Sequence, residues 1–153
     1  MQTAVSDQAA TDGSGVLPRL GALGLALACS GPLLLAAMLT PSAEGIGTHR
    51  QMGLPECGFV LATGYPCATC GCTTAFAHAA DGSLLSAIIT QPFGGLLALA
   101  LAMMALIAGW SAASGMKLAP LGRVMATRRF VLSWLVLLIV AWGYKAAVVA
   151  AGS

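Results

Sequence analysis

Four cysteines lie close together in the middle of the chain and are the residues best suited to chemistry. Cys67, Cys70 and Cys72 fall within six positions, and Cys57 lies ten positions before the first of them. His78 follows eight residues after Cys70, so the two would share one face of a continuous helix. Thiols form disulfides, bind soft metal ions and exchange electrons. The cluster therefore has three interpretations, which the sequence leaves open.

The first interpretation is a structural staple made of one or two disulfides. Disulfides persist in oxidising compartments, and four cysteines permit three pairings among which the sequence does not choose. Cys67 and Cys70 form a Cys-x-x-Cys pair, and Cys57 could bridge to either of them. In this interpretation the cysteines hold a loop in shape and carry out no reaction.

The second interpretation is a metal site. Zinc prefers four nitrogen or sulfur ligands in a tetrahedron, and the tight turn of a Cys-x-x-Cys pair supplies two of them. Only half of a strong zinc signature is present, because such signatures contain two separated pairs. Copper(I) also accepts thiolates, and Met52 lies in the same segment. The predicted metal ligands, with zinc as the first candidate metal, are Cys57, Cys67, Cys70, Cys72 and His78.

The third interpretation is a thiol–disulfide active site. A thiol at the N-terminus of a helix is stabilised as a thiolate by the helix dipole, and residues 73–80 can form two helical turns directly after the cysteines. The usual setting of such a site is a thioredoxin-like βαβ fold, which this apolar chain cannot build. A membrane oxidoreductase would instead need a quinone or a partner domain, and no quinone-site pattern stands out.

The composition places the cysteines in a membrane protein. Of the 153 residues, 58% are hydrophobic and 8% are charged, whereas about a quarter of the residues of a soluble domain are charged. The mean hydropathy of +0.88 also indicates that most of the chain is surrounded by lipid and not by water. A net charge of +2 is too small to indicate nucleic-acid binding. The lipid bilayer is therefore the expected partner.

Long apolar segments predict an all-α membrane protein with three transmembrane helices. The spans are expected at residues 20–40, 92–110 and 130–150, each near the roughly 20 residues that cross a bilayer as a helix. The first is expected to be an uncleaved span, because its apolar run is too long for a signal peptide and follows an acidic segment. Residues 1–18 are expected to form a flexible tail, and residues 19–153 the membrane domain.

The cysteines lie in the segment between the first two spans, residues 41–83, which is expected to face the extracytoplasmic side. The second connection, residues 111–129, carries four basic residues and no acidic one, so the positive-inside rule places it in the cytoplasm. The N-terminus is then cytoplasmic. A short interfacial helix is expected at residues 84–90, and Lys145, near the end of the third span, is expected to extend outward to the interface.

A larger pattern surrounds the cysteines, and these residues match it: Cys57, Phe59, Thr63, Gly64, Pro66, Cys67, Cys70, Gly71, Thr73, Thr74, Ala75, Phe76, Gly82, Gln91, Pro92 and Gly94. Their segment, from Cys57 to about Leu97, resembles a bacterial family of small integral membrane proteins of unknown function. The family signature contains Cys-Pro-x-Cys-Gly-x-Thr-Thr/Arg-Ala. Ala68 replaces its usual proline, and Cys72 stands where the signature has Met or Leu. The resemblance implies several membrane helices and supplies no reaction. The expected location is the bacterial inner membrane.

The expected function is non-catalytic. The protein is interpreted as a structural or accessory membrane subunit whose loop, stapled by a disulfide or clamped by a metal, contacts another membrane protein or a second copy. The alternative is a membrane thiol–disulfide oxidoreductase or a protein that handles zinc or copper. No Ser-His-Asp triad, phosphate-binding loop or carboxylate pair occurs in the sequence, and no charge lies in the middle of a span, which argues against an ion-coupled transporter.

Overall fold

A computed structural model describes residues 15–116 and 118–151, and over these residues the protein is helical and contains no strand. Three helices are long and apolar enough to cross a membrane, which confirms the predicted fold class. They are α2 (Val16–Ala36), α6 (Pro92–Ser114) and α8 (Arg128–Ala151). The helix α2 begins four residues before the predicted start of the first span. Most of the predicted N-terminal tail, residues 1–14, lies outside the described residues.

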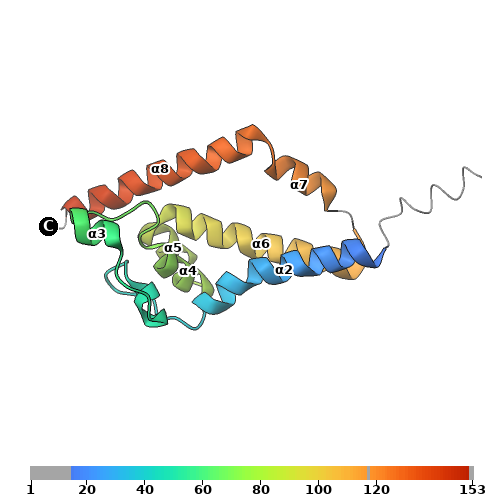
Figure 1. Ribbon diagram of the computed structural model, residues 1–153, viewed down its shortest axis with the longest axis horizontal. Helices are drawn as coiled ribbons and strands as arrows, with labels where there is room; N and C mark the ends of the chain where they lie inside the picture. The colour runs from blue at the N-terminus through green and yellow to red at the C-terminus, as the bar shows by residue number, and fades with distance from the viewer. Residues whose placement is uncertain (1–14, 117, 152–153) are drawn as a thin grey trace, which may run out of the picture.

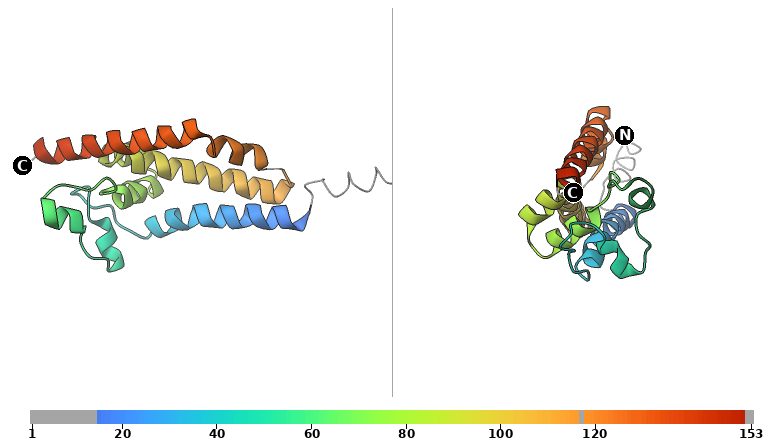
Figure 2. Two further views of the ribbon diagram at one scale, coloured as in Figure 1. Left: turned by 45° about the horizontal axis from the view of Figure 1, so that its top comes forward. Right: turned by 90° about the vertical axis from the view of Figure 1, so that its left-hand side faces the viewer.

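Two of the long helices pack closely, and the third lies apart from them along most of its length. α2 and α6 run side by side in opposite directions, whereas α8 lies away from α2 and converges on the start of α6 toward its own C-terminal end (Figures 1 and 2). Small residues allow the close approach of α2 and α6. The residues of these two helices that are buried and apolar are Ala22, Ala26, Cys29, Ala36, Ala98 and Ala108.

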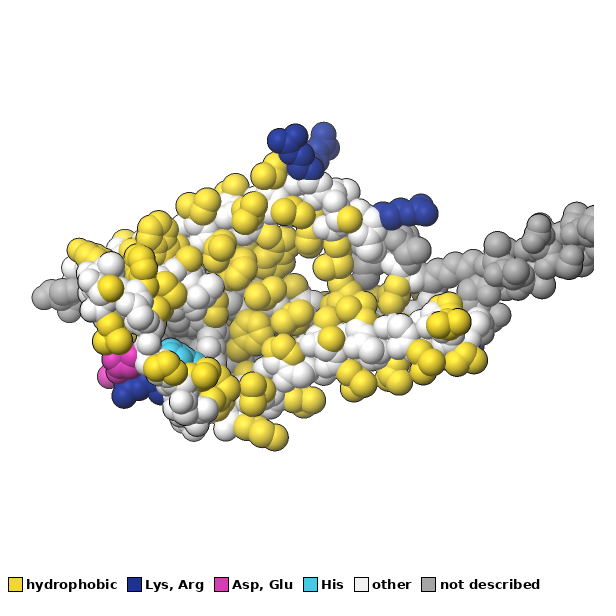
Figure 3. Space-filling model, in the orientation of Figure 1, with side chains coloured by type: hydrophobic (Ala, Val, Ile, Leu, Met, Phe, Trp, Pro, Cys, Tyr) yellow, Lys and Arg dark blue, Asp and Glu magenta, His cyan; other side chains and the backbone are white. Residues whose placement is uncertain are grey.

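The outer surfaces of the long helices are apolar. In the space-filling view, hydrophobic side chains cover the spans, while charged side chains gather near the loop end and around the connection between α7 and α8 (Figure 3). α7 (Ala119–Met125) lies within the connection that the sequence predicted between the second and third spans. This distribution matches a protein whose long helices contact lipid.

The segment between α2 and α6 folds into four short helices at one end of the bundle (Figure 1). They are the 3₁₀ helix η1 (Thr48–Met52), α3 (Gly58–Thr63), α4 (Cys72–Ala80) and α5 (Leu84–Thr90). α5 spans the predicted interfacial helix. α4 contacts α2, α5 and α6, and its residues Thr74, Ala75 and Ala77 are buried. We call residues 37–91, between α2 and α6, the loop domain. The helix α4, which follows the cysteines, lies at its centre.

Two glycines allow α4 and α5 to lie directly on the first turn of α6. A Cβ atom at Gly94 would lie 3.0 Å from the Cα atom of Cys72 and 3.1 Å from the Cβ atom of Ala75. A Cβ atom at Gly95 would lie 2.9 Å from the backbone nitrogen of Ile88. The Gln-Pro-x-Gly part of the sequence pattern thus brings the start of α6 against the cysteine segment.

Aromatic side chains near the end of α8 attach this helix to the loop domain. The indole Nε1 of Trp142 donates a hydrogen bond to the carbonyl oxygen of Pro66 at 2.9 Å, just before the Cys-x-x-Cys pair. The hydroxyl of Tyr144 donates to the carbonyl oxygen of Ile89 at 3.1 Å. α8 is therefore bonded to the cysteine segment and to α5, although it packs little against α6.

Lys145 adds a third connection, and its predicted outward orientation is wrong. Only 6% of the residue is exposed, and its ammonium group donates to the carbonyl oxygens of Gly45 and Thr90, each at 3.1 Å. These carbonyls belong to segments far from α8 in sequence. Because they offer hydrogen bonds inside the protein, the side chain points under the loop domain instead of toward water.

Replacing Lys145 with methionine is expected to loosen α8. The carbonyls of Gly45 and Thr90 would lose their donor, and a buried acceptor without a partner costs about 1–3 kcal/mol. We expect a lower midpoint of thermal unfolding in detergent, measured by circular dichroism. Arg129→Met removes an exposed cation from the start of the same helix and serves as the control. Equal midpoints for the two variants would contradict the proposed connection.

Candidate functional site

The Cys-x-x-Cys pair forms a tight turn that ends where α4 begins. The backbone amide of Cys70 donates to the carbonyl of Cys67 at 3.1 Å, which turns both thiols to the same side. Gly71 follows as the N-cap of α4 with a φ of 92°, a conformation that favours glycine. A Cβ atom there would also lie 2.7 Å from the carbonyl oxygen of Gly45. Gly71 is therefore required for the turn to pack on the preceding loop.

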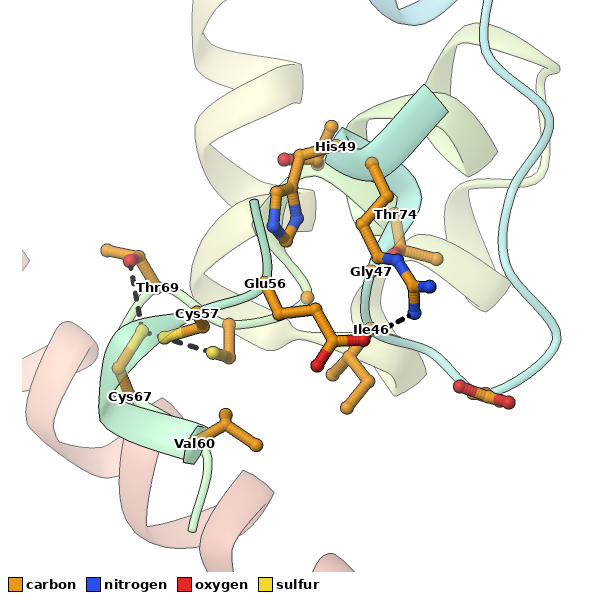
Figure 4. Close-up of a pocket in the computed structure, with 14 residues that line it drawn as sticks. Ile46, Gly47, His49, Glu56, Cys57, Val60, Cys67, Thr69 and Thr74 are labelled. Carbon is orange, nitrogen blue, oxygen red and sulfur yellow. Dashed lines mark hydrogen bonds and ion pairs between the residues drawn. The ribbon is translucent and has the colours of Figure 1, made fainter. Parts of the chain in front are cut away.

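Cys57 reaches this turn because α3 folds back on the chain. Cys57 is the N-cap residue of α3, and the helix ends at Gly64 in a left-handed conformation, with a φ of 75°, that reverses the chain toward the turn. As a result, the Sγ atoms of Cys57, Cys67 and Cys70 all lie within 4.8 Å of one another (Figure 4). The Sγ atoms of Cys67 and Cys70 are 3.1 Å apart and hydrogen-bonded, and all three thiols are free. We call these three residues the thiol cluster.

The other two predicted ligands are not brought to the thiol cluster. Cys72 is the first residue of α4, and its Sγ atom lies 3.3 Å from the position of a Cβ atom built on Gly94. Its thiol therefore faces α6. His78 is half-buried in the last turn of α4, six residues beyond the helix start, which corresponds to about 9 Å along the axis. The direction of its side chain keeps Cys72 out of the thiol cluster, and the rise of α4 carries His78 away from the turn.

A cavity of about 440 Å³ opens beside the thiol cluster. Its charged and titratable wall comes from the loop between α2 and α3, and the residues there are Glu44, His49, Arg50 and Glu56. Arg50 and Glu56 form an ion pair of 2.7 Å between Nη1 and Oε1, in which both side chains are about half exposed. Figure 4 shows His49 and Glu56 facing the space next to the cysteines. The cavity is open to water on the side of this ion pair.

Sequence reasoning missed His49, which lines the cavity although it precedes Cys67 by 18 positions. The imidazole is half-buried, and its Nε2 atom lies 3.1 Å from the carbonyl oxygen of Pro55. The signal available in the sequence was its position in the same loop as the cysteines. That signal does not reveal which side of the loop the ring faces.

Buried threonines fix η1, and with it His49, on the surface of α4. The hydroxyls of Thr48 and Thr74 are hydrogen-bonded at 2.8 Å, and Thr48 also accepts a hydrogen bond from the amide of Ser42 at 3.0 Å. Both threonines are almost completely buried. Thr74 belongs to the sequence pattern after the cysteines, and the structure gives it a positioning role at the cavity.

Gln91 joins the cysteine turn to α6. The side chain is fully buried, its Oε1 atom accepts from the amide of Gly94 at 2.7 Å, and its Nε2 atom donates to the carbonyl of Ala68 at 3.1 Å. Ala68 is the first of the two residues between the cysteines of the pair. One side chain thus caps the second membrane helix and holds the Cys67–Cys70 turn.

The cysteines differ strongly in acidity. Partial burial raises the pKa of Cys67, but hydrogen bonds with Thr69 and Cys70 outweigh it and lower the pKa to about 7. Burial, together with the hydrogen bond to Cys67, raises the pKa of Cys70 to about 12. Burial and the nearby charge of Cys67 raise the pKa of Cys72 to about 11. Cys67 is therefore the first of these three thiols to ionise as the pH rises through neutrality.

Comparison with known proteins finds a family match for the cysteine region but no activity. Residues 57–105 match the model of a family described as a protein of unknown function (DUF2752). The match begins at Cys57, contains the thiol cluster and Gln91, and ends within α6. No curated protein and no solved structure matches the chain. The match is consistent with the expected uncharacterised family.

Proposed function

We propose that this protein is an integral membrane protein whose loop domain binds one soft metal ion, Zn²⁺ or Cu⁺, through Cys57, Cys67 and Cys70. The observation that carries the proposal is the convergence of the three Sγ atoms within 4.8 Å of one another. Zinc–thiolate bonds of about 2.3 Å place sulfurs ~3.8 Å apart in a tetrahedron, so the cluster has nearly the required dimensions. Thiolates are also the ligands that select these metals.

The metal would clamp the loop domain. Cys57 starts α3, whereas Cys67 and Cys70 precede α4, so one ion joins two segments that chain connectivity alone leaves loosely connected. Two hydrogen bonds hold the Cys67–Cys70 turn. Gln91 donates to the carbonyl of Ala68, and Trp142 of α8 donates to the carbonyl of Pro66. This arrangement favours a structural or accessory membrane subunit, with lipid around its spans and a second copy or another membrane protein as its partner.

We further propose that the protein lies in a bacterial inner membrane with its N-terminus in the cytoplasm and its thiol cluster outside. The arrangement of α2, α6 and α8 puts the loop domain at one end and the connection with the basic residues at the other (Figure 1). Basic connections stay in the cytoplasm. After metal removal and reduction, a thiol reagent that cannot cross membranes should label the cluster from the extracytoplasmic side. Labelling from the cytoplasmic side alone would reverse the orientation.

Elemental analysis tests metal binding directly. Protein extracted in detergent without added metal is expected to carry about one zinc or copper per chain. A variant with Cys57, Cys67 and Cys70 all changed to serine is expected to carry none, while Cys29→Ser, which alters a buried residue of α2, retains the metal. Native protein that contains no metal, takes up none and has all its thiols open to alkylation would overturn the proposal.

Thiol–disulfide exchange is the second candidate function, favoured by the acidity difference within the Cys-x-x-Cys pair. The Cys67 thiolate would attack a substrate disulfide, and Cys70, 3.1 Å away, would displace the bound sulfur. The substrate would gain two electrons and leave as two thiols, and a Cys67–Cys70 disulfide would form. Return to the dithiol needs a second dithiol as reductant. Metal binding and exchange use the same two sulfurs, so the two functions exclude each other while a metal is bound.

The pH dependence of alkylation separates Cys67 from its neighbours. In reduced, metal-free protein we expect iodoacetamide to modify Cys67 at a rate that increases as the pH rises through about 7, because the thiolate is the reactive form. Cys70 and Cys72, whose pKa values are raised, should react slowly over the same range. Mass spectrometry of peptides after short exposures measures all three. Faster modification of Cys70 than of Cys67 would contradict the assigned order of acidity.

A further inference from the structure

Three thiolates leave a tetrahedral zinc ion one ligand short, and the cavity beside the thiol cluster contains the candidates for the fourth position. The carboxylate of Glu56 is held by Arg50 in an ion pair of 2.7 Å, and carboxylates suit harder cations than the ones that thiolates select. His49 lies on the same cavity and carries a nitrogen that zinc accepts readily. The inference that follows rests on the metal binding proposed above.

The hydrogen bond of His49 defines which nitrogen is available. The Nε2 atom lies 3.1 Å from the carbonyl oxygen of Pro55, and because a carbonyl can only accept, Nε2 must carry the proton. In the neutral imidazole the lone pair is then on Nδ1. Histidines that bind metals typically donate their other ring N–H to a carbonyl or carboxylate in this way. Pro55 also lies only two residues before Cys57, so the accepting carbonyl and a thiol of the cluster belong to one short segment.

The backbone around His49 holds the ring at the wall of the cavity. Thr48, its neighbour, is buried and hydrogen-bonded to Thr74 of α4, so η1 cannot move far from the cavity. Figure 4 shows the His49 side chain extending into the cavity on another wall from Cys57 and Cys67. The ring lies outside the group of atoms within 4.8 Å of one another, so ligation requires the cysteine segments to close on the ring, and Pro55, which accepts from the ring, belongs to the same segment as Cys57.

We propose that His49 is the fourth ligand of this site, through Nδ1, and that it completes a Cys₃His set with Cys57, Cys67 and Cys70. A four-ligand set with one imidazole is typical of structural zinc, whereas copper(I) is satisfied by three thiolates. The inference therefore selects Zn²⁺ as the metal. It also assigns the histidine position of the site to His49 in place of His78.

Cobalt substitution tests the ligand set. Co²⁺ is expected to give the intense visible bands of a tetrahedral ion together with thiolate charge-transfer bands in the near ultraviolet. His49→Ala should shift and weaken the visible bands and lower zinc affinity at least tenfold, while the charge-transfer bands of three thiolates persist. His78→Ala is the matched control and should leave the spectrum and the affinity unchanged. Helix content measured by circular dichroism confirms that each variant is folded.

X-ray absorption of the zinc-loaded native protein tests the same ligand without a mutation. It is expected to show three sulfurs at about 2.3 Å, one nitrogen at about 2.0 Å and the outer-shell scattering of one imidazole. Absence of imidazole scattering, or an identical cobalt spectrum in His49→Ala, would overturn the assignment of His49 and leave the three-thiolate site standing. A spectrum altered by His78→Ala would also overturn it. Failure of the native protein to bind zinc or cobalt at all would remove the proposed metal binding itself.

Discussion

Cys70→Ser is expected to lower the zinc affinity of this protein by more than a hundredfold. Loss of a partner that only orients a ligand costs about 10–100-fold in metal affinity, and loss of a thiolate ligand costs more. Cys70 is the most buried member of the thiol cluster, with 9% of its surface exposed, so its sulfur cannot be replaced at the metal by a water molecule without rearrangement of the turn. Competition with a chelating dye measures the affinity. The same loss is expected for Cys57→Ser and Cys67→Ser.

Two other cysteines provide the controls for this series. Cys72→Ser should retain zinc, because the Cys72 thiol faces Gly94 of α6 and not the cluster. Cys29→Ser should also retain it, since Cys29 is buried within α2. If Cys72→Ser loses zinc as completely as Cys70→Ser does, the metal is bound by a different set of thiols. That result would favour a site made of all four cysteines among the predicted ligands, Cys57, Cys67, Cys70 and Cys72.

Gln91→Leu is expected to destabilise the protein by about 2–4 kcal/mol and to weaken metal binding as well. The substitution keeps the volume of a fully buried side chain but leaves the amide of Gly94 and the carbonyl of Ala68 without their partners, each at a cost of about 1–3 kcal/mol. Because Ala68 lies between Cys67 and Cys70, release of its carbonyl should loosen the turn. We expect zinc affinity to fall roughly 10–100-fold, as for other residues that support ligands.

Gln51 is a matched control for Gln91. Its side chain makes the same kind of paired hydrogen bonds, with the amide and the carbonyl of Thr40, but it is exposed. Water can replace both bonds, so Gln51→Leu should change the free energy of unfolding by less than about 0.5 kcal/mol. Thermal unfolding and zinc titration of both variants measure the difference. An equal effect of the two substitutions would show that the buried hydrogen bonds of Gln91 stabilise the protein no more than the exposed ones of Gln51.

Part of the candidate site was predictable because it is local. Cys67 and Cys70 are three residues apart, and a single turn brings such residues together whatever the rest of the chain does. Cys72 was placed with them by proximity in sequence, yet it starts α4 and each residue of a helix rotates by about 100°. Its direction depended on where the helix begins, which the sequence did not define to within one residue.

Cys57 and His49 show where prediction from the sequence reaches its limit. Cys57 was included among the predicted ligands, but its contact with the turn depends on the reversal at Gly64 after α3. His49 was not included, because its place at the cavity depends on the hydrogen bond between Thr48 and Thr74, 26 positions apart. Contacts over such separations are decided by how helices pack and not by any local pattern.

The sequence by itself determined the membrane as solvent, the three long helices and the Cys-x-x-Cys turn, because hydropathy and short-range spacing are properties of neighbouring residues. Only the tertiary structure decided which donors surround the cavity and where Lys145 points. The sequence near Lys145 predicted a side chain extended to the membrane interface, but the folded loop offers its ammonium group the carbonyls of Gly45 and Thr90. These partners come from segments 100 and 55 positions away, and they become neighbours only after the helices have packed.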